Sequence, residues 1–141
     1  MDFMKFLILY IYLLISMNTI AQDFSKHKWE NRLIIIFTEN LDNSFYQKQV
    51  KELTKNEDGL LERKILVYHI FPGKYKIGLM TKDKWEKNTK NKMSDVPFEI
   101  SLVGLDGGVK LSQSQPLTTK ELFSIIDKMP MRRDERERKK E

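Results

Sequence analysis

The sequence of 141 residues contains no cysteine. Disulfide bonds, iron–sulfur clusters and zinc sites built on thiolates are therefore excluded, and the protein has no thiol chemistry of its own. Histidine is nearly as scarce, because the only two, His27 and His69, lie far apart in the chain. Two isolated imidazoles are a weak basis for a metal centre, so we expect neither a metal nor a cofactor.

The chain also lacks an extended tract of one charge sign. Charged residues make up 32% of the sequence and the net charge is +5, but the lysines are interleaved with aspartates and glutamates. Such mixing is typical of an ordinary solvated surface and argues against a nucleic-acid partner. The positive balance favours weak attraction to anionic groups, which leaves a protein or an anionic ligand as the expected partner.

No apolar run is long enough to span a bilayer. About a dozen apolar residues, 6–17, follow a start with one basic residue, Lys5, whereas a membrane span needs roughly 20. Thr19 and Ala21 place small residues where a signal peptidase cuts, immediately after Ala21. We expect residues 1–21 to be a secretory signal peptide rather than a retained anchor. The mature protein would then be periplasmic or extracellular, without a stable membrane span, and without cysteine at the cut it would carry no lipid anchor.

Two apolar, β-branched segments predict the centre of a sheet. Residues 33–37 (LIIIF) and 64–71 (KILVYHIF) show no alternation, which is typical of strands buried on both faces. Residues 44–55, between them, carry one apolar stripe and are predicted to form a helix capped by Asp42 or Asn43. The order strand, helix, strand predicts a parallel pair joined by a right-handed crossover.

The last third of the chain predicts a hairpin and a helix. Residues 98–103 alternate as a half-buried strand does, and Asp-Gly-Gly within 104–108 is a hairpin signal leading to a returning strand over 109–112. Thr118 and Glu121 have the spacing of a capping box. The helix that they start is predicted to end at Pro130.

Residues 75–93 are Lys-rich and give the weakest pattern. We expect one short amphipathic helix there, over Lys82–Lys90. The last eight residues, 134–141, are nearly all charged with opposite charges four apart, which predicts an exposed, frayed helix.

Together these elements predict an α/β fold of thioredoxin-like topology. It would have a central mixed sheet of about four strands flanked by helices, with a C-terminal β-hairpin followed by a helix. Residues 22–133 would form the single domain, between the signal peptide (1–21) and a charged tail (134–141). Thioredoxin-like folds place a proline, often cis, just before the hairpin, and Pro97 occupies that position.

Four segments carry a resemblance to a known family. They are WENR at 29–32, GLLER at 59–63, LVGLDGGVKL at 102–111 and the stretch 122–133, which ends in IDKMPMRR. On these segments the chain resembles a thioredoxin-like, peroxiredoxin-related family of unknown function. Its members include small exported bacterial proteins and vertebrate secreted coiled-coil-domain-containing and sushi-repeat-containing proteins.

The resemblance implies a fold, and for its relatives it suggests oxidoreduction. Reactive cysteines of thioredoxin-like proteins follow the first central strand, at the N-terminus of the next helix, where the helix dipole and free N–H groups stabilise a thiolate. In this chain Asp42, Asn43, Ser44 and Phe45 hold that position. Thiol oxidoreductase activity is therefore excluded, and only the fold carries over.

The vacant redox position remains a candidate site. A non-thiol enzyme would use Asp42 and Ser44 there, with His69 from the second strand as the group that activates the serine. The simpler interpretation makes Asp42 a helix cap and His69 a partly buried strand residue with one hydrogen bond.

A second candidate site comprises Asp127, Arg132 and Arg133. It would be either an anion-binding pocket or a structural lock in which an arginine pairs with Asp127 or Asp106. The leading hypothesis is an exported, non-catalytic binding module. The alternatives are a non-thiol enzyme and a protein that binds anionic surfaces through its arginines and scattered lysines.

Overall fold

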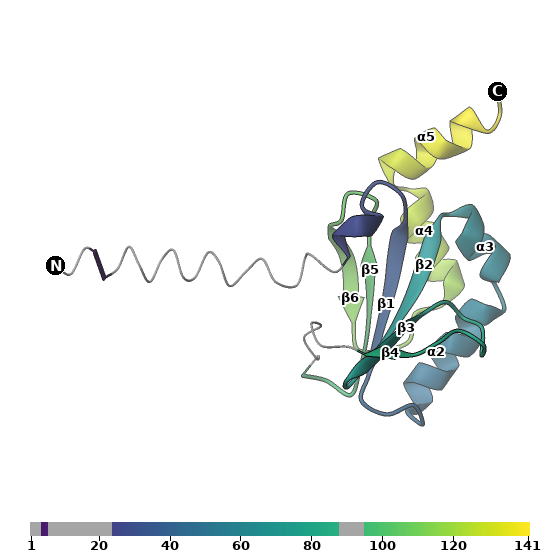
Figure 1. The fold of residues 1–141 in the computed structure, drawn as a ribbon. Helices are drawn as coiled ribbons and strands as arrows, with labels where there is room; N and C mark the ends of the chain where they lie inside the picture. The colour runs from purple at the N-terminus through teal and green to yellow at the C-terminus, as the bar shows by residue number, and fades with distance from the viewer. Residues whose placement is uncertain (1–3, 6–23, 88–94) are drawn as a thin grey trace.

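The computed structural model describes residues 4–5, 24–87 and 95–141, and its centre is one mixed six-stranded sheet (Figure 1). The strands lie in the order β4-β3-β2-β1-β5-β6, so the first strand of the chain is an inner strand. The strands are β1 (Arg32–Thr38), β2 (Ile65–Phe71), β3 (Lys74–Ile77), β4 (Glu86–Lys87), β5 (Phe98–Val103) and β6 (Val109–Gln113).

The two apolar segments form the centre of the sheet, as predicted. β1 and β2 are parallel, with Ile36 opposite His69, and β1 pairs on its other edge with β5 in antiparallel register. Leu33, Ile34 and Ile36 in β1 are all buried. Consecutive strand residues point to opposite faces, so β1 is covered on both sides.

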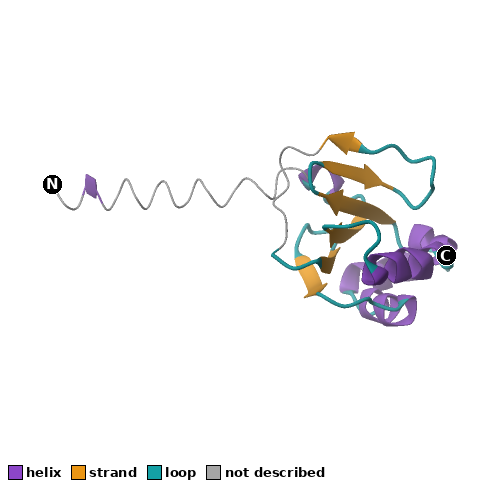
Figure 2. Ribbon diagram, turned by 90° about the horizontal axis from the view of Figure 1, so that it is seen from below, coloured by secondary structure: helices purple, strands orange, loops and turns teal. Residues whose placement is uncertain are grey.

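One face of the sheet is covered by helices α2 (Ser44–Thr54), α3 (Glu57–Glu62) and α4 (Thr119–Asp127), which gather on the same side in Figure 2. Their apolar side chains meet those of the strands in the larger of two cores. This core contains Ile34, Ile36, Tyr46, Leu53, Leu60, Ile65, Val67, Phe98, Ile100, Leu102, Leu117, Leu122 and Ile126.

The opposite face carries a smaller core and no helix of comparable length among the described residues. Phe24 packs on this face just before the short helix η1 (Ser25–His27), with its ring 5.0 Å from that of Tyr68. The His27 ring lies beside the same tyrosine and bonds to its hydroxyl. The polar lead-in to the first strand is therefore part of the folded domain.

Both predicted helix starts are present. Asn43, one of the two predicted caps, accepts hydrogen bonds from the N–H groups of Phe45 and Tyr46 at the start of α2. Thr118 and Glu121 form a complete capping box at the start of α4. The first predicted helix ends at Thr54, but the chain then forms the additional helix α3, which the sequence pattern did not predict.

The prediction of a helix over Lys82–Lys90 is wrong for the described residues of that segment, and the sheet has six strands instead of about four. Gly73, with φ of +76°, reverses the chain directly after β2, so β3 returns antiparallel beside it. Tyr75 and Ile77 of β3 then pack in the smaller core. Residues 88–90 lie outside the described residues.

One proline lies where the sequence predicts it and another does not. Pro97 directly precedes β5 as predicted, and no peptide bond among the described residues is cis. The helix expected to end at Pro130 ends at Asp127, and Pro130 is instead the first residue of α5 (Pro130–Arg138). A proline suits the first helical position because its N–H would have no helical partner there. The expected boundary between domain and tail, at residue 133, falls inside α5.

No helix among the described residues is long and apolar enough to cross a membrane. The predicted signal peptide, apart from residues 4–5, lies outside the described part of the chain.

Candidate functional site

The loop after β1, which contains the vacant redox position predicted from the sequence, is organised by local hydrogen bonds. The Asn40 side-chain oxygen accepts from the Asp42 N–H at 3.0 Å. The Asn43 oxygen accepts from the N–H groups of Phe45 at 2.9 Å and Tyr46 at 3.1 Å. The polar side chains of Asn40 and Asn43 thus satisfy the backbone of the loop and of the first turn of α2.

Asp42 and Ser44 are exposed in this loop and are not joined to a catalytic partner. Among the described residues, neither side chain makes a hydrogen bond. The Phe45 side chain is 42% exposed, and its ring lies 5.8 Å edge-on from that of Phe98. The four residues of the vacant redox position therefore comprise one cap, two solvated polar side chains and one half-exposed ring.

His69 lies in the core and is engaged at both ring nitrogens. Nδ1 accepts from the Tyr46 hydroxyl at 2.9 Å, and Nε2–H donates to the Gly78 carbonyl at 2.8 Å. Burial lowers the pKa of His69 to about 4 and raises the pKa of Tyr46 to about 12. His69 is therefore a neutral ring that ties β2 to α2, and neither of its nitrogens is available to activate Ser44.

The arginines form a larger arrangement than the sequence suggested. An ionic cluster of three arginines and three carboxylates joins the start of β1, the end of α3, the end of α4 and helix α5. Its members are Arg32, Glu62, Arg63, Asp127, Arg132 and Glu135.

Arg132 occupies the middle of the ionic cluster and is 1% exposed. Its guanidinium donates to Glu62 at 2.8 Å and, at 3.3 Å each, to Asp127 and Glu135. Burial opposes the charged form, but these hydrogen bonds outweigh it and raise the pKa of Arg132. Every nitrogen of this side chain has a partner, so Arg132 is held as a structural lock. Arg133, the next residue, is exposed.

Arg63 binds Asp127 through the edge of its guanidinium that carries Nε and Nη2. Nε donates to one carboxylate oxygen at 3.0 Å and Nη2 to the other at 2.8 Å. Burial alone would raise the pKa of Asp127, but Arg63 and then Arg132 lower it overall. Asp127 is thus engaged by two arginines, while Asp106, the other proposed partner, pairs with Lys110 at 2.8 Å.

Arg32 differs from the other two arginines because half of its guanidinium has no partner. Nη1 donates to the Arg63 carbonyl at 2.9 Å and to both oxygens of Glu135 at 3.3 Å. Nε and Nη2 are buried and have no hydrogen-bond partner among the described residues. The side chain as a whole is 1% exposed, and a buried donor without a partner is costly.

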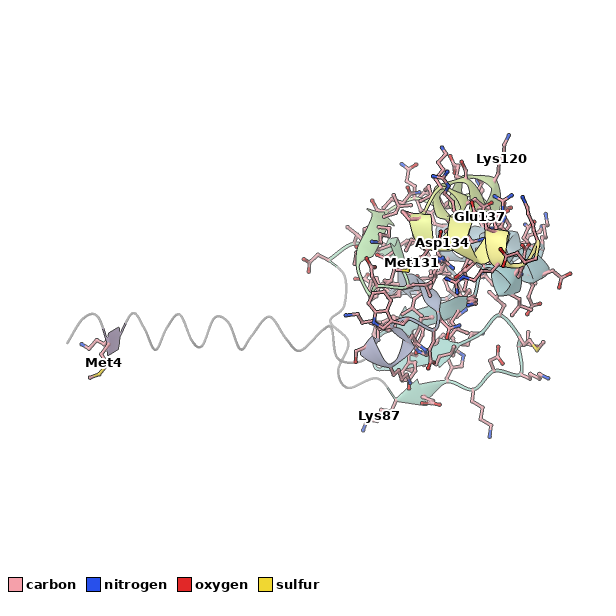
Figure 3. The ribbon with its side chains drawn as sticks, turned by 90° about the horizontal axis from the view of Figure 1, so that it is seen from above. Met4, Lys87, Lys120, Met131, Asp134 and Glu137 are labelled. Carbon is pink, nitrogen blue, oxygen red and sulfur yellow. The ribbon has the colours of Figure 1, made fainter. Side chains whose placement is uncertain are left out.

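Arg32 also lines a cavity of about 350 Å³ between the β5–β6 hairpin and the start of α5. In Figure 3, which looks down on this end of the molecule, Met131 marks the first turn of α5. The wall of the cavity consists of Arg32, Gly104, Leu105, Asp106, Lys110, Met129, Pro130 and Met131.

Sequence reasoning singled out Arg132 and Arg133 and missed Arg32. A charged residue directly before an apolar strand resembles a solvated lead-in, and nothing local marks it as buried. One available signal was its position in WENR, a segment that also carries the family resemblance. In the described part of the chain, no group of three or more His, Cys, Asp or Glu residues is placed to hold a metal ion.

Comparison with known proteins gives one match. The model of a family described as a domain of unknown function, DUF4174, matches residues 23–135. This range includes the whole described sheet and all the members of the ionic cluster. No curated protein and no solved structure matches the chain.

Proposed function

Because the chain belongs to the DUF4174 family, whose description names no activity, we propose from its geometry that it is an exported, non-catalytic binding module on a thioredoxin-like scaffold.

The thioredoxin-like assignment is supported by the strand arrangement. β1 and β2 are parallel and central, α2 lies between them in the chain, and the β5–β6 hairpin occupies one edge of the sheet before helix α4. Pro97 directly precedes the hairpin. The β3–β4 pair on the other edge is an addition to the arrangement expected from the sequence.

The non-catalytic assignment rests on one observation: the Asn43 side chain occupies N–H groups in the first turn of α2. In a thioredoxin-like enzyme the free N–H groups of that turn stabilise the reactive anion. Here the Asn43 side chain accepts from two of them, those of Phe45 and Tyr46. Asp42 and Ser44 are left exposed beside this cap, and the only nearby imidazole, His69, is bonded to Tyr46 and Gly78.

Export is proposed from the sequence of residues 1–21. The apolar run and the small residues at positions 19 and 21 are those of a cleaved signal peptide. N-terminal sequencing of the protein recovered outside the cytoplasm is expected to begin at Gln22.

Turnover assays test the proposal. Protein expressed from the full-length sequence and purified should reduce neither peroxide nor insulin disulfides, and should hydrolyse an activated ester such as p-nitrophenyl acetate no faster than buffer. Ser44→Ala and Asp42→Asn variants serve as matched controls. An ester rate above buffer that disappears in the Ser44→Ala variant would establish the enzymatic alternative and overturn the proposal.

A further inference from the structure

We propose that the cavity lined by Arg32 binds a small organic monocarboxylate with an apolar body. This inference rests on the proposed function and specifies the ligand class, at a place that the sequence did not indicate. Three features support it. The edge of the Arg32 guanidinium that carries Nε and Nη2, called the free edge below, has no partner among the described residues. The nearby carboxylates of the protein are bonded to other groups, and the rest of the cavity wall is apolar.

The free edge of Arg32 is the one that arginine uses for bidentate carboxylate binding. Nε–H and Nη2–H point in the same direction, and two parallel N–H···O bonds to a carboxylate fit that spacing. Arg63, in the same ionic cluster, uses this edge to bind Asp127 at 3.0 and 2.8 Å. On Arg32 the same two nitrogens are buried and lack a partner among the described residues.

The free edge lies away from the partners of Nη1, in a residue that lines the cavity. Nη1, on the other side of the guanidinium, contacts the Arg63 carbonyl and Glu135. Neither Arg63 nor Glu135 is part of the cavity wall, whereas Arg32 is. Because the guanidinium is planar, its Nε and Nη2 edge faces away from these partners. Both nitrogens are buried within the wall, so a carboxylate would bind them by displacing the side chains that cover them.

No carboxylate of the described chain is free to fill this position. Asp106 lines the cavity, but its two oxygens accept from the Gly108 N–H at 2.9 Å and from the Lys110 ammonium at 2.8 Å. The hydrogen bond from Lys110 is the main reason that the pKa of Asp106 is lowered. Asp106 is therefore paired with Lys110, and Glu135 contacts Arg32 only at Nη1, so no carboxylate of the described residues bonds to the free edge of Arg32.

The start of α5 adds to the attraction for an anion. Its cap residue, Met129, provides no side-chain hydrogen bond to the first turn, and Pro130 and Met131 continue the cavity wall. The N-terminal end of a helix carries partial positive charge. A carboxylate bound to Arg32 would therefore lie beside an uncapped helix start as well as a guanidinium.

The rest of the wall sets the chemistry of the ligand's body. Leu105, Met129, Pro130 and Met131 present hydrocarbon and thioether surface, and methionine side chains adapt to irregular ligand shapes. A volume of about 350 Å³ is at the small end of ordinary ligand pockets. An aliphatic acid of about six carbons matches both the two-donor edge of Arg32 and the apolar lining.

Methionine-methyl NMR tests the inference with hexanoate as the probe. Hexanoate is expected to shift the methyl signals of Met129 and Met131 but not that of Met80, which lies outside the cavity wall. Hexanamide, which has the same body without the charge, should bind at least tenfold more weakly, and inorganic phosphate should leave both methyl signals unmoved. Arg32→Lys keeps the positive charge but removes the two-donor edge, so it should weaken hexanoate binding at least tenfold, while Arg133→Lys should not change it.

A cavity-filling variant, Met131→Trp, keeps Arg32 in place and should abolish binding if the ligand occupies this volume. It covers the case in which Arg32→Lys does not fold. Absence of methyl shifts, equal affinity for hexanoate and hexanamide, or binding that persists in Met131→Trp would each overturn the inference. The proposed function fails separately: turnover would refute it whatever hexanoate does, whereas a protein with neither turnover nor hexanoate binding would refute only the ligand assignment.

Discussion

At the scale of single residues, the clearest pH-dependent group is His69. Its pKa is 6.5 in an unfolded chain and about 4 in the folded protein, because burial disfavours the charged ring. Between these values the unfolded state binds more protons, so stability is fully present above pH 6.5 and is lost as the pH falls toward 4. A depression of this size corresponds to about 3 kcal/mol.

We therefore predict that urea unfolding will show a steep loss of stability between pH 6.5 and 4, and that His69→Gln will flatten it. The matched control is His27→Gln, because His27 is less buried and its pKa is lowered less strongly. If the His69 variant loses stability with pH as steeply as the parent, the neutral buried ring is not the cause.

Contacts between single residues could be predicted where a local sequence pattern specifies both partners. The capping pair Thr118 and Glu121 is three residues apart, so its contact follows from helix geometry. Arg32 and Glu135 are 103 residues apart, and only the completed fold brings them together. The same applies to the hydrogen bond between His69 and Tyr46. The sequence predicted a partly buried strand residue with one hydrogen bond, whereas His69 is buried and bonded at both ring nitrogens.

At the scale of elements, the start of α2 distinguishes a structural loop from a reactive one. Asn43→Ala removes the acceptor for the N–H groups of Phe45 and Tyr46, and we predict a loss of about 1 kcal/mol in the free energy of unfolding. Ser44→Ala, one residue away on the exposed surface, is predicted to change it by less than about 0.5 kcal/mol. Urea denaturation of the two variants in parallel makes the comparison, and similar losses in both would contradict the assignment of the cap.

Helices and strands with a strong apolar pattern could be predicted from the sequence. Those whose conformation depends on contacts with neighbouring elements of the fold could not. β1, β2 and β5 have continuous or alternating apolar residues, and each appears within one residue of its expected bounds. β3 is only four residues long and contains two lysines, so its strand conformation depends on the exposed edge of β2 beside it. Helix α5 has few apolar residues, and Arg132 and Glu135 attach it to the rest of the fold through ion pairs.

At the scale of the whole molecule, the ionic cluster joins the two ends of the described domain. A chain that ends at Arg133 would lack Glu135, the carboxylate that accepts from both Arg32 and Arg132. Removing one partner of a buried charge pair is destabilising by about 3 kcal/mol, so we predict a clearly lower urea midpoint for this truncation.

The control ends at Arg138 and removes only exposed residues beyond α5; its midpoint should equal that of the full chain. A Glu135→Gln variant separates loss of the carboxylate from loss of the helix. If the chain ending at Arg133 is as stable as the full chain, residues 134–141 are a dispensable tail, as the charge pattern alone suggested.

The inner position of β1 has a consequence for the order in which the protein is made. One edge of β1 pairs with β2, about thirty residues later in the chain, but the other edge pairs with β5, whose last residue is Val103. A nascent polypeptide leaving the ribosome thus carries β1 with one bare edge until late in synthesis, and pairings so distant in sequence form slowly. The sheet therefore cannot close around its first strand until β5 has been synthesised.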